Sequence, residues 1–362
     1  MTYRIEVRPE WALQQRNDEL GLQGLIDLLS AIASEGNLSR ACVRLGVSYR
    51  HGWAVLRQGA TSLGAALVTS RRGQQCKLTP LGEKLVWANK RALERLAPVM
   101  KSAASELESE IRRSLAGSQE TLRVQAGYAI ALVELLAMLQ KKRASHHVRY
   151  VGAAAALSAL ACGDCDVAGF AVPLGELEAE IMRGHARWLD RREHVLVHLV
   201  VRHQGLIVAP GNPLLIGSVA DLARPGVRFV NRQPGSGTRT LIELLLGRAG
   251  VGRASIAGFD LSENTHGAVA AYVASGLADA GPGVETAARR FGLGFVPLAN
   301  ERYLLACRRE ALHAGPGHDL LETIRSAEFR LRLSEIPGID LLDCGKVQRA
   351  GEAFALASAG KP

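Results

Sequence analysis

The larger, C-terminal part of the chain alternates between short strand-like runs and helix-like patterns. Apolar runs at 122–126, 148–151 and 166–172 predict strands, and each lies next to a segment with helical spacing. The alternation continues beyond them, with strands expected at 194–201, 205–209, 227–231, 278–280, 295–298 and 303–307. Such alternation predicts an α/β architecture with largely parallel sheets. The span is long for a single sheet, so we expect two lobes.

Residues 21–82 have a different pattern, which predicts two short helices joined by a tight turn. Asn37 is placed to cap the first helix and Ser48 the second, with Gly46 in the turn between them. Two short strands are expected at 67–70 and 76–79, as a hairpin. Helix, turn, helix and hairpin together predict an all-α winged helix-turn-helix.

The charge of residues 36–82 favours DNA as a partner. The whole chain carries 44 basic and 35 acidic residues, a net charge of +9. Residues 36–82 contain no Asp or Glu, and their basic residues are Arg40, Arg44, Arg50, Arg57, Arg71, Arg72 and Lys77. A surface without carboxylates suits contact with phosphates. A basic face that is merely solvated remains the alternative.

Residues 83–115 predict one long amphipathic helix. Its apolar positions recur at steps of three and four: Leu85, Ala88, Ala92, Leu96, Val99, Ala103, Leu107, Ile111 and Leu115. Pro98 should kink this helix or divide it. We expect a linker through which two copies pair, and packing on the protein's own body is the alternative.

The sharpest motif is Asn231-Arg-Gln-Pro-Gly-Ser-Gly-Thr-Arg239, which follows a strand and opens a helix. Free N–H groups at a helix start bind anions, so the motif predicts ligand contacts from Ser236, Gly237, Thr238 and Arg239. Arg239 could instead pair with Glu243 one turn later. A capped helix without a ligand is the other interpretation.

Two further loops lie where strands end and helices begin, at Gln125-Ala-Gly-Tyr128 and Glu263-Asn-Thr-His266. Ligands of α/β folds bind at the carboxyl ends of strands, so Tyr128, Thr265 and His266 are further candidates. His266 could donate to an oxyanion or cap its helix, and the sequence leaves both open.

Other chemistry has little support in the sequence. Cys162-Gly-Asp-Cys165 is a single CxxC, and no hydrolase motif is present, so we expect neither a metal site nor an enzyme. No segment has the apolar length of a membrane span, and charges near Met1 do not suit a signal peptide. We therefore expect a cytoplasmic protein without membrane contact.

The N-terminal part resembles the winged helix-turn-helix of the ModE family, which is related to the LysR type. The matching stretches are Gly36-Asn-Leu-Ser-Arg-Ala41, Leu45-Gly-Val-Ser-Tyr-Arg50, Trp53 and Leu78-Thr-Pro-Leu-Gly82. The resemblance implies a recognition helix carrying Ser48, Tyr49, Arg50, His51, Trp53 and Arg57. It implies a wing carrying Arg71, Arg72 and Lys77.

Residues 120–345 resemble the molybdate-binding-protein-like domain, a type-2 periplasmic binding fold. The matching stretches are Gly205-Leu-Ile-Val-Ala-Pro-Gly-Asn-Pro213, Asp221-Leu-Ala-Arg-Pro-Gly226, residues 228–239 and His266-Gly-Ala-Val-Ala-Ala-Tyr-Val-Ala-Ser-Gly276. The resemblance implies a two-lobed sensor without a covalent cofactor. Its effector would be molybdate, tungstate or the molybdopterin cofactor, with a small carboxylate as a further alternative.

These observations predict a multidomain chain. The expected parts are a DNA-binding domain (1–82), a linker helix (83–117), a two-lobed ligand-binding domain (118–346) and a loose tail (347–362). We expect a transcription regulator that binds a palindromic operator on double-stranded DNA as a dimer or tetramer. Through the resemblance, its targets would be molybdenum-related genes such as molybdoenzyme operons of the formate dehydrogenase type. The alternatives are a molybdopterin-handling enzyme or carrier and a solute-capture protein.

Overall fold

The computed structural model describes residues 4–15, 18–69, 76–116, 120–142 and 144–353. The chain divides into two compact units. The smaller is Arg8–Glu94, and the larger combines Met1–Val7 with Arg95–Pro362. The division at residues 94/95 falls inside the helix that the sequence predicts as a linker.

Three helices form the body of the smaller unit: α1 (Gln23–Glu35), α2 (Leu38–Leu45) and α3 (Tyr49–Leu63). Both predicted N-caps are confirmed. The Asn37 side chain accepts hydrogen bonds from the Ser39 and Arg40 N–H groups, and Ser48 Oγ accepts one from His51 N at 3.1 Å. Gly46 ends α2 with φ of 69°, a conformation that favours glycine.

The smaller unit also contains two hairpins, of which the sequence predicts one. Strands β3 (Val68–Thr69) and β4 (Lys77–Leu78) form the hairpin expected after α3. The residues between them, including Arg71 and Arg72, lie outside the described part of the chain. A second hairpin, β1 (Ala12–Gln15) with β2 (Asp18–Gly21), precedes α1 and was not predicted.

Glycines allow α3 to pack closely on the rest of the smaller unit. A Cβ at Gly59 would lie 2.5 Å from Leu25 Cδ2 of α1, and one at Gly52 would lie 2.5 Å from Cys42 Sγ of α2. The core is built mainly from α1, whose buried residues are Leu25, Ile26, Leu28, Leu29, Ala31 and Ile32. This packing fixes which face of α3 meets solvent.

Helix α4 (Pro80–Ala116) is continuous over 37 residues, with Pro98 inside it. Pro98 therefore does not divide the helix, because the loss of one N–H donor leaves the neighbouring helical hydrogen bonds available. From Arg95 onward α4 belongs to the larger unit.

Within the larger unit, α4 covers the edge of a sheet. Ser102 Oγ accepts a hydrogen bond from Tyr150 N at 3.1 Å, and Ser105 Oγ accepts one from Val148 N at 3.0 Å. Both N–H groups belong to the edge strand β6 (His146–Tyr150). An exposed strand edge is a template for unwanted pairing, and these serines cover it.

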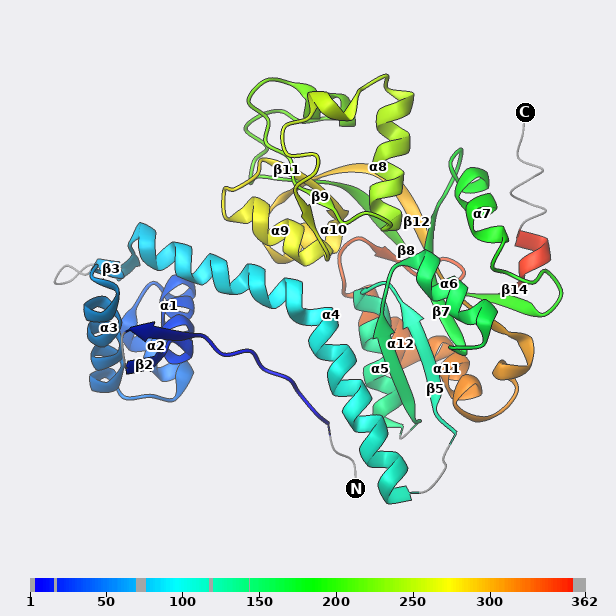
Figure 1. Ribbon diagram of the computed structural model, residues 1–362, viewed down its shortest axis with the longest axis horizontal. Helices are drawn as coiled ribbons and strands as arrows, with labels where there is room; N and C mark the ends of the chain where they lie inside the picture. The colour runs from blue at the N-terminus through cyan, green and yellow to red at the C-terminus, as the bar shows by residue number, and fades with distance from the viewer. Residues whose placement is uncertain (1–3, 16–17, 70–75, 117–119, 143, 354–362) are drawn as a thin grey trace. The chain divides into compact units, whose positions relative to one another are not determined.

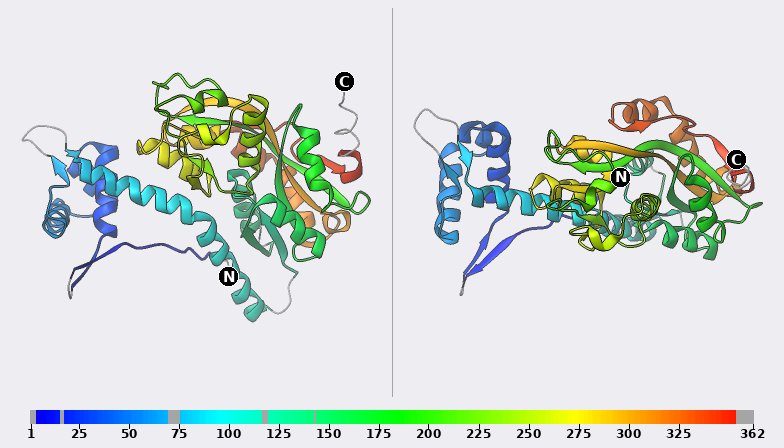
Figure 2. Two further views of the ribbon diagram at one scale, coloured as in Figure 1. Left: turned by 45° about the horizontal axis from the view of Figure 1, so that its top comes forward. Right: turned by 90° about the horizontal axis from the view of Figure 1, so that it is seen from above.

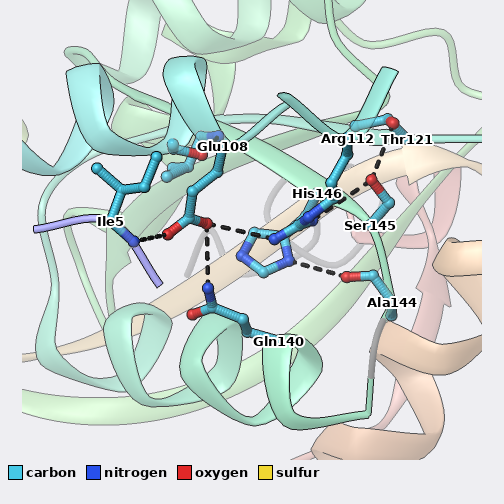
Figure 3. A network of polar contacts seen from close by, with 10 residues as sticks. Ile5, Glu108, Arg112, Thr121, Gln140, Ala144, Ser145 and His146 are labelled. Atoms are coloured by element: carbon cyan, nitrogen blue, oxygen red, sulfur yellow. Dashed lines mark hydrogen bonds and ion pairs between the residues drawn. The ribbon is translucent and has the colours of Figure 1, made fainter. Parts of the chain in front are cut away.

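A buried carboxylate strengthens this attachment (Figure 3). Glu108 Oε1 accepts a hydrogen bond from Ile5 N at 2.7 Å, and its Oε2 accepts from Gln140 Nε2 at 3.0 Å and Arg112 Nη2 at 3.3 Å. The network joins the start of the chain to α4 and to α5 (Ile130–Lys141). It explains why Met1–Val7 groups with the larger unit.

The larger unit is built on a mixed sheet with the order β11-β8-β12-β7-β5-β6. Strand β5 runs parallel to β6 and β7, whereas β8, β11, β12 and β7 pair antiparallel. The expectation of largely parallel sheets is therefore wrong for the centre of this unit. The strands not yet bounded are β5 (Leu122–Ala126), β7 (Val167–Pro173), β8 (His194–Val208), β11 (Ala280–Val284) and β12 (Gly294–Arg308).

Two lobes share the long strands β8 and β12, as expected for a two-lobed α/β domain (Figures 1 and 2). The first lobe contains β5–β7 with α5, α6 (Ala153–Cys162), α7 (Glu178–Ala186), α11 (Gly315–Arg325) and α12 (Ala327–Ser334). The second contains β11, the parallel pair β9 (Asn231–Arg232) and β10 (Ser262–Glu263), α8 (Gly237–Arg248), α9 (His266–Ala274) and α10 (Glu285–Arg290).

Strands β8 and β12 are each continuous across both lobes. They pair from Gly294↔Val208 to Arg308↔His194, with two local register shifts. The sequence predicted four short strands here, because polar residues 202–204 and 300–302 interrupt the apolar pattern. Those polar residues lie where the strands cross between the lobes.

The first residues of the predicted loose tail form regular structure. Val347–Arg349 forms β14, which pairs antiparallel with residues 195–197 of β8. The free edge of a long strand offers hydrogen-bond partners to any nearby chain, which explains this pairing. Residues 354–362 lie outside the described part.

The crossing strands predict a sensitive position at Gly205. A Cβ there would lie 2.1 Å from the Val296 carbonyl oxygen, which belongs to backbone and cannot move aside cheaply. We expect Gly205→Ala to lower the free energy of unfolding by about 1–3 kcal/mol, measured by thermal denaturation. Gly247→Ala is the control, since no atom lies within 4 Å of its added Cβ. Equal stability of the two variants would contradict the packing described here.

Candidate ligand-binding cleft and DNA-binding surface

A cavity of about 330 Å³ lies in the larger unit where the two lobes meet α4. Its walls come from the loops after β5 and β6, from the crossing strands, from the start of α8 and α9, and from α4. The polar and aromatic side chains on these walls are Tyr128, Tyr150, Arg202, Arg232, Gln233, Ser236, Thr238, Asn264, His266 and Tyr303.

Three helices begin at this cavity. Gly152 precedes α6, Ser236 caps α8 by accepting a hydrogen bond from Arg239 N at 3.2 Å, and His266 is the first residue of α9. The N-terminus of a helix carries partial positive charge and free N–H groups. Three such ends at one cavity favour an anionic ligand.

Arg232 is the central charged residue of the cavity. The residue is only 7% exposed, and no carboxylate pairs with it among the described residues. Nε donates to Gln233 Oε1 at 3.2 Å and Nη2 donates to Asn264 O at 2.9 Å, whereas Nη1 has no partner in the described part of the chain. Burial, and then repulsion from Arg202, lowers the pKa of Arg232. A buried cation with an unused N–H is a strong anion-binding feature.

The other arginines near the cavity have carboxylate partners. Arg202 Nε lies 3.0 Å from Glu301 Oε2, and both residues belong to the crossing strands. Arg95 of α4 pairs with the buried Glu263, with Nε 2.6 Å from Oε2. Glu301 and Glu263 are therefore already paired with other arginines. An anionic ligand can balance the charge of Arg232.

His266 faces the cavity rather than capping its helix. The cap of α9 is Thr265, whose Oγ1 accepts a hydrogen bond from Ala268 N at 2.9 Å. Burial, and then repulsion from Arg232 and Arg202, holds the pKa of His266 well below its ordinary value. The imidazole is therefore neutral near pH 7, and His266 Nδ1 has no partner among the described residues. It can offer one hydrogen bond to a ligand.

Arg239 pairs with Glu243, the second of the two partners that the sequence left open. Its Nε donates to Glu243 Oε1 at 2.9 Å, its Nη1 donates to Arg232 O at 3.3 Å, and its guanidinium lies 5.0 Å from the Phe259 ring centroid. Arg239 is not part of the cavity wall. Its partner is Glu243, four positions later on α8, as the alternative interpretation held.

The remaining predicted ligand residues divide by position. Tyr128, Ser236, Gly237, Thr238 and His266 line the cavity, whereas Thr265 does not. Sequence reasoning missed Arg232, Arg202, Tyr150 and Tyr303, which also line it. Arg232 is part of the motif at residues 231–239. The polar residues 202–204, which interrupt an apolar strand pattern, were the sequence feature that could have pointed to Arg202.

In the smaller unit, the solvent face of α3 carries predicted DNA-binding residues. Tyr49 is 53% exposed, and Arg50, His51 and Arg57 are exposed. Lys77 is exposed on β4, whereas Ser48 uses its Oγ as a helix cap. Trp53 is half-buried against the unit's core, with its ring 6.4 Å from that of Tyr49. Trp53 therefore supports the helix more than it projects from it.

The described residues offer no metal site. No group of three or more His, Cys, Asp or Glu side chains among them could hold a metal ion. Cys162 is exposed at the end of α6, and the buried Cys165 Sγ lies 3.7 Å from Ala156 O. No described helix combines the length and apolarity of a membrane span.

Comparison with known proteins gives the class of the larger unit. The PBP superfamily domain matches residues 136–325, just over half of the chain. The chain belongs to this superfamily. A Bacillus subtilis (strain 168) protein named "Uncharacterized protein YvgK" is 33% identical over 206 residues. The match covers 55% of this chain and 64% of that protein, so the chain spans less than two thirds of its relative.

Solved structures of regulators and binding proteins resemble the chain at low identity. A hydrogen peroxide-bound mutant of Corynebacterium glutamicum OxyR has a TM-score of 0.41 at 19% identity, covering 93% of this chain and 94% of that one. CbnR, a LysR family transcriptional regulator, has 0.38 at 18%, covering 83% and 96%. A Vibrio cholerae ABC-type phosphate transport receptor has 0.43 at 16%, covering 61% and 100%. All three TM-scores are below 0.5.

The cavity predicts that Arg232 decides anion affinity. We expect Arg232→Gln to weaken binding of inorganic phosphate or molybdate by about tenfold to a hundredfold, because charged hydrogen bonds are lost. Isothermal titration calorimetry measures this directly. Arg248→Gln is the control, since Arg248 is an exposed partner of Glu176 elsewhere on α8. Equal affinities for the two variants would contradict the assignment of Arg232.

Proposed function

We propose that the chain is a DNA-binding transcription regulator that senses a small anion. One observation carries the proposal: α4 joins a three-helix unit with an exposed basic helix to a two-lobed unit with a cationic cavity. The cavity wall brings together hydrogen-bond donors for an anion, so the proposed role is binding rather than catalysis. The protein would act in the cytoplasm, where DNA is found.

DNA recognition is assigned to α3. A recognition helix of this type lies in the major groove and reads bases with residues near its N-terminus. Tyr49, Arg50 and His51 are exposed in the first turn of α3, and Arg57 follows two turns later. No carboxylate occurs between residues 36 and 82 to repel phosphates. The hairpin β3–β4 with Lys77 would serve as the wing.

The effector is assigned to the cavity around Arg232. Molybdate, tungstate and the molybdenum cofactor are the proposed candidates, since each offers anionic oxygens to Arg232, Ser236 and His266. Control of molybdenum-related genes, such as molybdoenzyme operons, would follow. Binding would shift the protein between lobe arrangements only if the anion prefers one of them.

Pairing of two copies is assigned to the outward face of α4. Leu96 is 40% exposed and Leu107 47% exposed, and the exposed Ala103 lies between them at helical spacing. The opposite face of the helix packs on the protein's own body through Ser102, Ser105 and Glu108. The apolar stripe is thus available to a second copy, which suits a palindromic operator.

The DNA assignment predicts a loss of affinity in α3 variants. We expect Arg50→Ala and Arg57→Ala each to weaken binding to DNA from upstream of the protein's own gene by about 1–3 kcal/mol, or to reduce the salt slope by about one. Fluorescence anisotropy over a range of salt concentrations measures both. Arg289→Ala, at an exposed arginine of α10, is the control. Unchanged binding would favour a molybdopterin carrier whose helical unit contacts protein.

The pairing assignment predicts a change of mass. We expect the double variant Leu96→Glu/Leu107→Glu to convert a dimer or tetramer into a smaller species, because carboxylates would be buried in the pair. Size-exclusion chromatography with light scattering measures the mass. Leu331→Glu, at a 65% exposed position of α12, should leave it unchanged. Equal masses for all three proteins would remove α4 as the pairing surface.

A further inference from the structure

We propose that the cavity takes an organic anion, in which a phosphate or carboxylate group is joined to a planar ring. The ring lies against helix α4. This inference rests on the proposed anion site and narrows its ligand, because it excludes a bare tetrahedral oxyanion as the best-fitting occupant.

The two lobes contribute different chemistry to the cavity. The second lobe supplies Arg232, Ser236 and His266, which are hydrogen-bond donors to an anion. The first lobe supplies Tyr128 and Tyr150, whose rings lie 5.1 Å apart at 75°. Aromatic side chains contact planar groups favourably, edge to face or stacked. A ligand with a charged end and a planar end matches this division.

The size of the cavity agrees with an organic ligand. Its volume of about 330 Å³ lies at the lower end of the range for sites that bind small organic molecules. A single water molecule occupies about 30 Å³, and a tetrahedral oxyanion only a few times that volume. An oxyanion at Arg232 would leave the aromatic side of the cavity to water.

Helix α4 closes the cavity with apolar surface. Pro98 and Val99 belong to the wall, and Val99 is 62% exposed although it is apolar. Val99 continues the apolar stripe of Leu96, Ala103 and Leu107 at helical spacing, and it is the member of that stripe that belongs to the cavity wall. Burial of this side chain by a ring would stabilise the complex.

Contacts on both sides hold this part of α4 in place. On the second lobe, Arg95 pairs with Glu263, and Asn264 Nδ2 donates to Arg95 O at 2.9 Å. On the first lobe, Ser102 Oγ accepts from Tyr150 N at 3.1 Å. Val99 lies between Arg95 and Ser102 in the sequence of α4. A ligand in the cavity therefore touches both lobes and the helix that continues into the smaller unit.

The test compares anions that share a charged group. Calorimetric titration of the full chain would use inorganic phosphate against phenyl phosphate, formate against benzoate, and molybdate. We expect each ring-bearing anion to bind at least about tenfold more tightly than its partner. Phenyl phosphate should also bind more tightly than molybdate.

Two variants separate the ring contact from the anion contact. Val99→Gln should weaken phenyl phosphate by about threefold or more and leave inorganic phosphate unchanged. Leu331→Gln is the control at an exposed apolar position of α12, and it should change neither affinity. Arg232→Gln should weaken both anions.

The outcomes distinguish this inference from the proposed function. If phosphate or molybdate binds as tightly as phenyl phosphate, or Val99→Gln acts equally on both phosphates, the ligand class is overturned. The anion site would then still stand, provided that Arg232→Gln weakens binding. If no probe binds, or if Arg232→Gln has no effect, the proposed anion site itself is overturned.

Discussion

A buried arginine without a carboxylate partner among the described residues is the constraint around which the larger unit is organised. Removing an ion from water costs several kcal/mol, and Arg232 recovers part of this through hydrogen bonds to Gln233 Oε1 and Asn264 O. Its neighbours Arg202 and Arg95 have carboxylates of their own. The start of α8 and α9 adds further positive potential at the same place. An anion that enters the cavity meets donors that are already oriented, so little reorganisation opposes binding.

Helix α4 connects this site to the rest of the chain through faces of different chemistry. Serine hydroxyls and the Glu108 carboxylate attach one face to the first lobe, where they satisfy N–H groups of β6 and Ile5. Arg95 attaches the helix to the second lobe through Glu263. Exposed apolar side chains of α4 include Leu96, Val99 and Leu107, and Val99 also belongs to the cavity wall. One helix therefore takes part in the contact with both lobes, the cavity wall and the proposed pairing surface.

Local signals in the sequence were reliable where a short segment sets its own geometry. The caps at Asn37, Ser48 and Ser236 were predictable because each side chain bonds to N–H groups within three residues. The continuity of β8 and β12 was not predictable from the sequence. Arg202 and Glu301 interrupt the apolar pattern of these strands, yet they pair with each other across β8 and β12. The role of Arg232 was not predictable either, because it depends on which carboxylates, distant in the sequence, already form ion pairs with other arginines. Arg239, equally basic and nearer the helix start, is held by Glu243.

The central claim is that occupancy of the Arg232 cavity changes DNA binding by the smaller unit. Its most direct test is the dissociation constant for DNA from upstream of the protein's own gene, measured with and without a saturating concentration of the tightest-binding probe anion. The account predicts a change of at least about fivefold in the unsubstituted protein and none in Arg232→Gln. A dissociation constant that is the same with and without the bound anion would contradict it.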